Sequence, residues 1–188
     1  MLVKIYVVDD DPVDRMIFEK HIQKVCNEQF YTIKTSQQNS EENSSFPRLE
    51  YKIDSEGQSA RDVMEQPLEQ IQVKVSCFST ASAALAQIRT LFLKGDFDTL
   101  PDLIFLDMVL PQMDGWEFIK KLADLLIAIP GYNNVKSKLG IYLLTSFVNQ
   151  FDLQKANTTP LIKDYLLKPI LANDICSILH DYLRAKQK

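Results

Sequence analysis

Residues 103–118 read LIFLDMVLPQMDGWEF, and this stretch decides the fold. Its first four residues are all apolar, which is typical of a buried strand in a parallel sheet. An acidic residue, Asp107, comes directly after them. The pair Asp114-Gly115 then predicts a turn that leads into a helix over about 115–127, because Asp favours turns and Gly supplies backbone freedom. We therefore expect a strand, a turn and a helix, with a carboxylate where the strand ends.

The same pattern of strand and helix repeats along the chain. Residues 2–8 predict a first strand rich in β-branched side chains, and further strands are predicted at 73–78, 141–144 and 165–167. A first helix begins at Asp11-Pro12, and later helices are predicted over 81–93, after Thr80 as N-cap, and over 172–185. Because such crossovers are right-handed, the alternation predicts an α/β fold: a doubly wound, five-stranded parallel sheet with helices on both faces.

Residues 31–72 interrupt this pattern. The segment is too long for a usual connection between a helix and a strand, so we interpret it as an insertion between the first helix and the second strand. Residues 36–45 are rich in Ser, Gln, Asn and Glu, a composition typical of a flexible loop. Residues 30–34 and 49–53 alternate apolar and polar side chains. A β-hairpin with a mobile tip and a disordered surface loop are equally open alternatives.

Length and composition limit the classes of function. With 188 residues, one domain with an insertion is the simplest reading, and an output domain has little room. A net charge of -4 leaves no basic stripe, which argues against direct binding to nucleic acid. No long apolar stretch predicts a membrane span, and no signal peptide precedes residue 9, so we expect a cytoplasmic protein. Three distant cysteines predict neither a disulfide framework nor a zinc site.

Polar residues follow the predicted strands at one edge of the sheet. Asp9 and Asp10 follow the first strand, Asp107 the third, Thr145 the fourth and Lys168 the fifth. Because sites in such sheets lie outside the carboxyl ends of the strands, we expect these side chains to converge. Closely spaced carboxylates suit Mg²⁺, and a carboxylate nucleophile can form an aspartyl-phosphate. Thr145 and Lys168 can donate hydrogen bonds to phosphoryl oxygens.

Four segments together resemble the receiver domains of bacterial two-component response regulators. They are VVDDDP at 7–12, LIFLDMVLPQMDGWEF at 103–118, LLTS at 143–146 and YLLKPI at 165–170. Each segment alone is a weak signal, but four in the right order, each at a strand end, form a specific one. The resemblance implies a flavodoxin-like sheet with strand order 2-1-3-4-5, and a single-domain response regulator similar to the chemotaxis receivers.

The resemblance also implies roles for the acidic residues. Asp107 is then the phosphoacceptor, which makes the chain a phosphoprotein rather than an enzyme that turns over an external substrate. Asp10 is expected to bind Mg²⁺ directly, together with Asp107, and Asp9 to bind it through water. The backbone carbonyl of Val109 is expected to supply a further ligand. Asp11 is better explained as the N-cap of the first helix than as a ligand.

Further implications concern switching and partners. Thr145 and Tyr165 are expected to form a switch pair, and the Lys168-Pro169 peptide bond is expected to be cis. The phosphoryl group would come from a phosphohistidine on a sensor histidine kinase or a histidine phosphotransfer protein. A downstream protein target would then bind the surface around the fourth helix, the fifth strand and the fifth helix.

Two alternatives and one departure accompany this interpretation. A receiver-like adaptor that signals by docking alone would be expected to lack one of the acidic or lysine positions, and this sequence lacks none. A hydrolase resembling the haloacid dehalogenase group would carry Asp two residues after its nucleophile, where Val109 stands.

The resemblance to receiver domains implies that Val109 and Phe147 flank the path of the hydrolytic water. Because both are apolar, we predict slow autodephosphorylation and a long-lived phosphorylated state.

Overall fold

The computed structural model describes residues 1–38, 72–127, 139–147 and 150–186, with side chains described outside 27–38. Its centre is one five-stranded parallel sheet in the order β2-β1-β3-β4-β5. The strands are β1 (Leu2–Val8), β2 (Gln72–Phe78), β3 (Leu103–Asp107), β4 (Gly140–Thr145) and β5 (Ile162–Leu167). This confirms the predicted fold class and strand order. The strands at 141–144 and 165–167 are longer than expected because Gly140 and Thr145 also join β4 and residues 162–164 also join β5.

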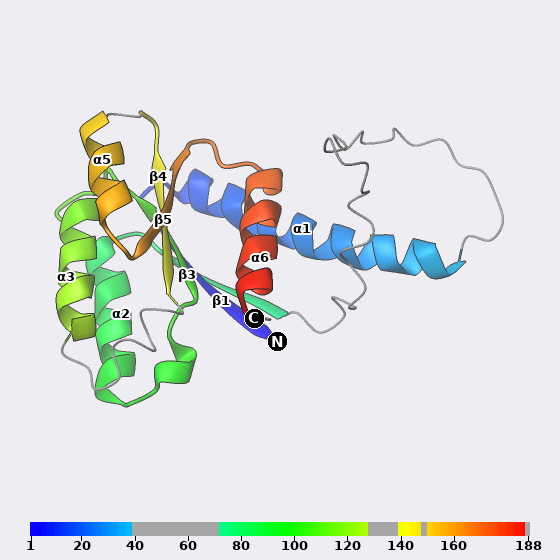
Figure 1. The fold of residues 1–188 in the computed structure, drawn as a ribbon, viewed down its shortest axis with the longest axis horizontal. Helices are drawn as coiled ribbons and strands as arrows, with labels where there is room; N and C mark the ends of the chain where they lie inside the picture. Colours follow the sequence, from blue (N-terminus) through cyan, green and yellow to red (C-terminus); the bar gives the residue numbers. More distant parts are fainter. Residues whose placement is uncertain (39–71, 128–138, 148–149, 187–188) are drawn as a thin grey trace.

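Helices cover both faces of the sheet (Figure 1). On one face lie α1 (Pro12–Gln38) and α6 (Ala172–Lys186), which bury a core with Phe18, Ile22 and Ile175. On the other face lie α2 (Ala81–Leu93), α3 (Gly115–Ile127) and α5 (Gln150–Thr158), together with the short 3-10 helix η2 (Phe97–Thr99). The helix at 150–158 was not assigned from the sequence. Its polar composition and single buried residue, Ala156, leave little apolar periodicity to detect.

The first helix corrects one expectation. A strand was a candidate at 30–34, as half of a hairpin, but α1 continues through these residues to Gln38. After Pro12 the helix contains neither Gly nor Pro, so no residue type stops it. Five alternating residues are too few to distinguish a strand from the end of a helix. The other half of the hairpin, 49–53, and the rest of the insertion after Gln38 lie outside the described residues.

Local signals fix where several helices begin. The Asp11 carboxylate accepts a hydrogen bond of 2.7 Å from the Val13 amide, which confirms Asp11 as the N-cap of α1. Thr80 caps α2 in the same way by accepting from the Ala83 amide at 3.2 Å. Asp114 accepts from the Glu117 amide at 2.8 Å and caps α3. These caps start each helix directly after the loop that follows a strand.

The two ends of the described chain lie close together (Figure 1), beside the amino-terminal end of β1, whereas Asp107 lies at the carboxyl end of β3. At the amino-terminal end of β1 the Met1 carbonyl accepts from the Gln72 amide at 2.9 Å. Tyr182, near the end of α6, donates its hydroxyl to Asp102 at 2.5 Å, just before β3 begins. Chain ends and acidic site are therefore separated by the length of the strands. Within the described residues, none of the helices has the length and apolarity that crossing a membrane requires.

Candidate functional site

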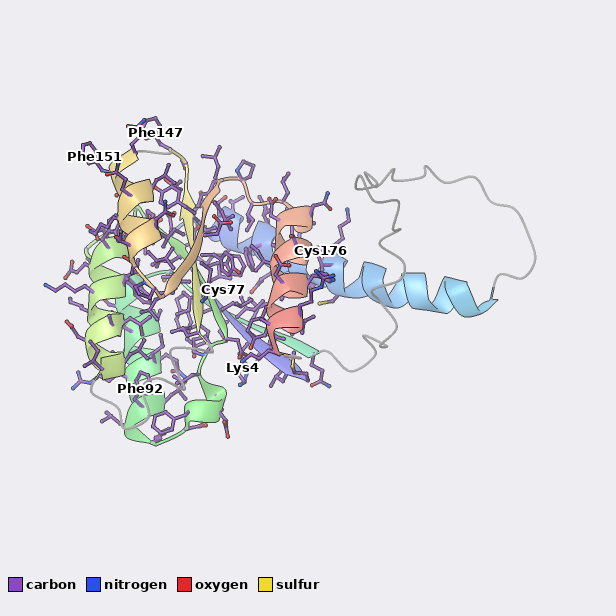
Figure 2. All side chains as sticks on the ribbon, in the orientation of Figure 1. Lys4, Cys77, Phe92, Phe147, Phe151 and Cys176 are labelled. Atoms are coloured by element: carbon purple, nitrogen blue, oxygen red, sulfur yellow. The ribbon has the colours of Figure 1, made fainter. Side chains whose placement is uncertain are left out.

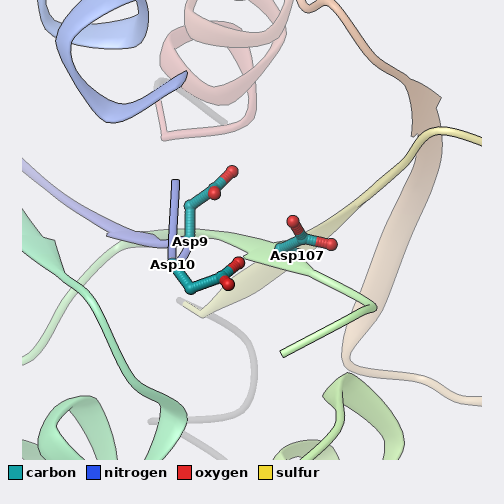
Figure 3. Close-up of side chains that lie close together, drawn as sticks. All are labelled: Asp9, Asp10 and Asp107. Carbon is teal, nitrogen blue, oxygen red and sulfur yellow. The ribbon is translucent and has the colours of Figure 1, made fainter. Parts of the chain in front are cut away.

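Three carboxylates meet where β1 and β3 end. Asp9 and Asp10 follow β1, and Asp107 is the last residue of β3, its neighbour in the sheet. One oxygen of each carboxylate lies within 4.8 Å of the other two. Figure 3 shows the three side chains close together. Asp9 and Asp107 are buried, with 1% and 7% of their surface exposed, whereas Asp10 is exposed. The sheet register thus brings the predicted acidic residues together.

Because the cluster is largely buried, its negative charges are unfavourable unless a positive charge lies close to them. Removal from water raises the pKa of Asp9, although the Lys168 ammonium and the Asp11 amide, which donates to Asp9 at 2.9 Å, oppose the rise. The negative charge of Asp107 also raises the pKa of Asp9. A divalent cation would relieve the same repulsion. Three carboxylates with hard oxygens, one of them open to solvent, fit Mg²⁺, which keeps several waters.

Lys168 supplies the positive charge in this structure. Its ammonium lies 2.5 Å from Asp107 Oδ2, 2.7 Å from Asp9 Oδ2 and 3.0 Å from Asp14 Oδ2. Burial lowers the pKa of Lys168, but the hydrogen bonds that its ammonium donates to Asp107, Asp9 and Asp14 outweigh this effect, and the pKa ends above its ordinary value. The ammonium therefore stays charged beside Asp107. The expected cis peptide bond between Lys168 and Pro169 is confirmed.

Asp14 is a site residue that sequence reasoning missed. It lies in the first turn of α1, four residues after Asp10, and its carboxylate reaches Lys168 from the helix side. An acidic residue in a first turn is ordinarily explained by the positive end of the helix dipole. The available signal was that this helix starts directly at the acidic cluster, so its first turn has to face the strand ends.

The structure places Thr145 and Tyr165 differently from the four charged residues. The Thr145 hydroxyl is buried and donates to the Phe147 carbonyl at 2.8 Å, so it is engaged within its own loop rather than with Asp107. The Phe147 amide donates back to the Thr145 hydroxyl at 3.2 Å. Tyr165 is partly buried and packs against the core between the sheet and α2, α3 and α5. Their switching role stays a prediction.

The loop after Asp107 is packed tightly against the start of α3. The Val109 amide donates to Asp107 Oδ1 at 2.8 Å, and the Gly115 amide donates to the Met108 carbonyl at 3.2 Å. A Cβ at Gly115 would lie 2.7 Å from the Met108 sulfur and 3.1 Å from the Asp107 carbonyl oxygen. Gly115 has no left-handed φ. Its use is therefore space for close approach rather than the backbone freedom expected from the sequence. That the Val109 carbonyl binds a metal stays a prediction.

Two apolar side chains on the loops after β3 and β4 are exposed. Val109 is 78% exposed and Phe147 is 76% exposed, on the loops that follow β3 and β4. Figure 2 shows Phe147 and Phe151 at the end of α5 that lies beside the carboxyl edge of the sheet. The two positions that were expected to flank attacking water thus present apolar side chains to solvent.

Comparisons with known proteins agree with this geometry. A family model described as the response regulator receiver domain matches residues 53–180, which include Asp107, Thr145 and Lys168. Asp9 and Asp10 lie before the matched range, and the pairing of β1 with β3 is what places them at the site. A comparison with curated proteins found no match.

Solved structures show the same fold at low sequence identity. A two-component response regulator from Cytophaga hutchinsonii aligns with a TM-score of 0.61 and 16% identity, covering 96% of each chain. The Vibrio cholerae chemotaxis protein CheY4 aligns with a TM-score of 0.53 and 16% identity, covering 97% of this chain and 99% of its own. A response regulator described as putative, from Chloroflexus aurantiacus, aligns with a TM-score of 0.55 and 17% identity, covering 98% of this chain and 99% of its own. Sheet order, acidic cluster and family match agree, and the chain belongs to the response regulator receiver domain family.

Proposed function

We propose that the chain is a phosphoacceptor response regulator of a two-component phosphorelay, with Asp107 as the acceptor. The observation that carries this proposal is the contact of 2.5 Å between the Lys168 ammonium and Asp107, inside a group of three carboxylates. Asp9, Asp10 and Asp107 would hold Mg²⁺, which when bound neutralises charge on the transferring phosphoryl group. In this proposal the receiver domain spans residues 1–188, with the segment between α1 and β2 as an insertion.

The proposed reaction is an in-line transfer. An oxygen of the Asp107 carboxylate forms a bond to phosphorus while the P–N bond of a phosphohistidine breaks, and its electron pair stays on the imidazole nitrogen. The histidine would belong to a sensor histidine kinase or a histidine phosphotransfer protein. Lys168 would donate to a phosphoryl oxygen, because its ammonium already lies beside the acceptor oxygen.

The switch that we propose starts from the loop contact of Thr145. Its hydroxyl would leave the Phe147 carbonyl, to which it now donates at 2.8 Å, and donate to a phosphoryl oxygen on Asp107. The loop after β4 would then move and change the space next to the half-buried Tyr165. A protein target would recognise the altered surface of α5, β5 and α6, which is a shift between two packings.

The experiment that tests the acceptor is intact mass after incubation with acetyl phosphate and Mg²⁺. We expect one phosphoryl adduct on the wild type and none on Asp107→Asn. Asp124→Asn, at an exposed position of α3, is the matched control and should be labelled like the wild type. If a folded wild type that binds Mg²⁺ acquires no adduct, the proposal fails and a receiver that signals by docking alone is favoured. Steady phosphate release without an adduct would instead indicate a hydrolase.

The phosphorylated state should be long-lived. The side chains of Val109 and Phe147 are exposed beside the site and carry no polar atoms that could orient an attacking water. We expect slow loss of phosphate from the purified adduct, and several-fold faster loss from Val109→Asn, which adds a hydrogen-bonding group. Decay of the adduct can be followed by mass or by Phos-tag electrophoresis. Loss from the wild type within seconds in buffer with Mg²⁺ would contradict this prediction.

A further inference from the structure

We propose that Asp14 is a positioning residue for Lys168 and holds its ammonium beside Asp107. The inference rests on the proposed function, because positioning has a purpose only if Asp107 accepts a phosphoryl group. Lys168 has a long side chain with many rotamers and has to be held to act at one atom. An ammonium has three N–H donors. Three carboxylate oxygens lie within 3.0 Å of it, from Asp107, Asp9 and Asp14.

Asp14 differs from the other two partners in what else it has to do. Asp9 and Asp107 belong to the group of carboxylates that would hold Mg²⁺, and Asp107 is also the proposed nucleophile. Among the described residues, Asp14 is outside that group. A phosphoryl group on Asp107 would likewise change the contact between Asp107 and Lys168. Asp14 is therefore the partner that can keep the ammonium in place throughout the transfer.

The helix gives Asp14 a fixed position. It stands at the third residue of α1, after Pro12 and Val13, and the Asp11 cap fixes where the helix begins. One turn later Phe18, which is 1% exposed, anchors α1 to the sheet and packs against Phe105 with ring centres 4.6 Å apart. The dipole of the helix favours a negative charge in this turn. A carboxylate on a rigid element is suited to hold a flexible lysine.

The charge of Asp14 suggests a competing explanation, which the test has to exclude. Its side chain is 37% exposed, against 14% for Lys168 and 1% for Asp9. A solvated negative charge can also act alone, by repelling an anionic phosphodonor. Removing it would then speed phosphorylation whether or not Lys168 is present. If Asp14 acts by holding Lys168, removing it slows phosphorylation, and the effect disappears when Lys168 is absent.

The first experiment is a double-mutant cycle on the rate of adduct formation with acetyl phosphate and Mg²⁺. We expect Asp14→Ala to slow phosphorylation by about five-fold, the upper range for a partly exposed ion pair. In the Lys168→Met background the same change should have no effect. Glu117→Ala is the matched control, since Glu117 is the third residue of α3 and pairs with Lys121 at 2.8 Å, and we expect it to leave the rate unchanged. Asp14→Asn, which keeps an acceptor oxygen, should lose less than Asp14→Ala and carries the comparison if the alanine variant does not fold.

The second experiment does not need phosphorylation. In metal-free protein, the ammonium hydrogens of Lys168 should exchange slowly with water, because each has an acceptor and the side chain is largely buried. NMR spectra of ¹⁵N-labelled lysine ammonium groups, assigned by the loss of one signal in Lys168→Met, measure this exchange. We expect several-fold faster exchange in Asp14→Ala and no change in Glu117→Ala.

The outcomes separate the two proposals. Unchanged exchange in Asp14→Ala, or an equal change in rate with and without Lys168, would overturn the positioning role. Faster phosphorylation of Asp14→Ala would overturn it as well. Suppose that exchange is faster in Asp14→Ala but the wild type acquires no adduct. The contact would then be supported as the determinant of the Lys168 position, and the proposed function would be rejected.

Discussion

At Gly115 the start of α3 approaches the end of β3 and the loop after Asp107 closely. The Met108 backbone and the Asp107 carbonyl leave no room for a side chain there, since a Cβ would lie 3.0 Å from Met108 Cα. Backbone atoms cannot move aside as the end of a flexible side chain can. The position of the acceptor thus depends on a residue that carries no functional group.

We expect Gly115→Ala to destabilise the fold by about 1–3 kcal/mol, the usual cost of forcing extra atoms into a packed region. The added Cβ would also displace the loop after Asp107 and slow phosphorylation. Urea denaturation measures the first effect and adduct formation the second. Gly140→Ala is the matched control, because its closest neighbour would be the Lys163 side chain at 3.0 Å, which can shift. Equal stability of the two variants would contradict the role of close approach.

The sequence predicted most of the site at this scale, for a physical reason. Parallel strands put their carboxyl ends at one edge, so Asp9, Asp10 and Asp107 could be assigned from their order alone. Asp14 could not, because its contact depends on the direction of a helix relative to the sheet. The hydrogen bond from the Thr145 hydroxyl to its own loop could not be predicted either, since a hydroxyl has several possible acceptors.

At the scale of elements, strands were easier to predict than helix ends. The three central strands, β1, β3 and β4, are short and mostly apolar runs that the sheet buries, whereas α1 continues to Gln38 through residues that alternate like a strand. The polar α5 escaped prediction because only Ala156 is buried. Side-chain contacts with α3 also hold α5 in place. Trp116 Nε1 donates to Asp152 at 2.8 Å, and the Lys155 ammonium lies 4.1 Å from the centre of the indole ring.

Trp116 should therefore stabilise the docking of α5 against α3. We expect Trp116→Phe to lower the free energy of unfolding by about 1–2 kcal/mol, since it removes a hydrogen bond to a charged group and weakens the cation–π contact. Lys155→Met removes the ammonium of the cation–π contact and serves as the second variant. In a double-mutant cycle by urea denaturation, the two changes should cost less together than the sum of their separate effects. Strict additivity would show that Trp116 and Lys155 do not interact.

At the scale of the whole molecule, several weak acids are buried or partly buried, and this favours their neutral form. Burial raises the pKa of Tyr6 and Tyr142, and burial with the hydrogen bond to Asp102 raises that of Tyr182. Burial, followed by the contact with Glu19 at 3.1 Å, raises the pKa of Cys77 from its ordinary value of 9.0 to about 12. Folding favours the protonated form of each group, so alkaline pH should oppose folding.

The sign follows from linkage. The contribution of Cys77 is complete below pH 9.0, where the unfolded thiol is protonated, and is lost as the pH rises toward about 12. We expect the free energy of unfolding, measured by urea denaturation, to fall over that range. Cys77→Ala and Tyr182→Phe should each make the fall less steep. A slope that neither substitution alters would contradict the assignment of these groups.

The separation between the chain ends and the acidic edge has a practical consequence. β1 has seven residues, so its two ends are roughly 23 Å apart at about 3.3 Å per residue. A fluorescent protein, an affinity tag or a tether to a sensor surface at either end would be attached on the far side of the sheet from Asp107. Immobilised protein should thus present its acceptor outward, which makes binding of a histidine phosphotransfer protein measurable in that orientation.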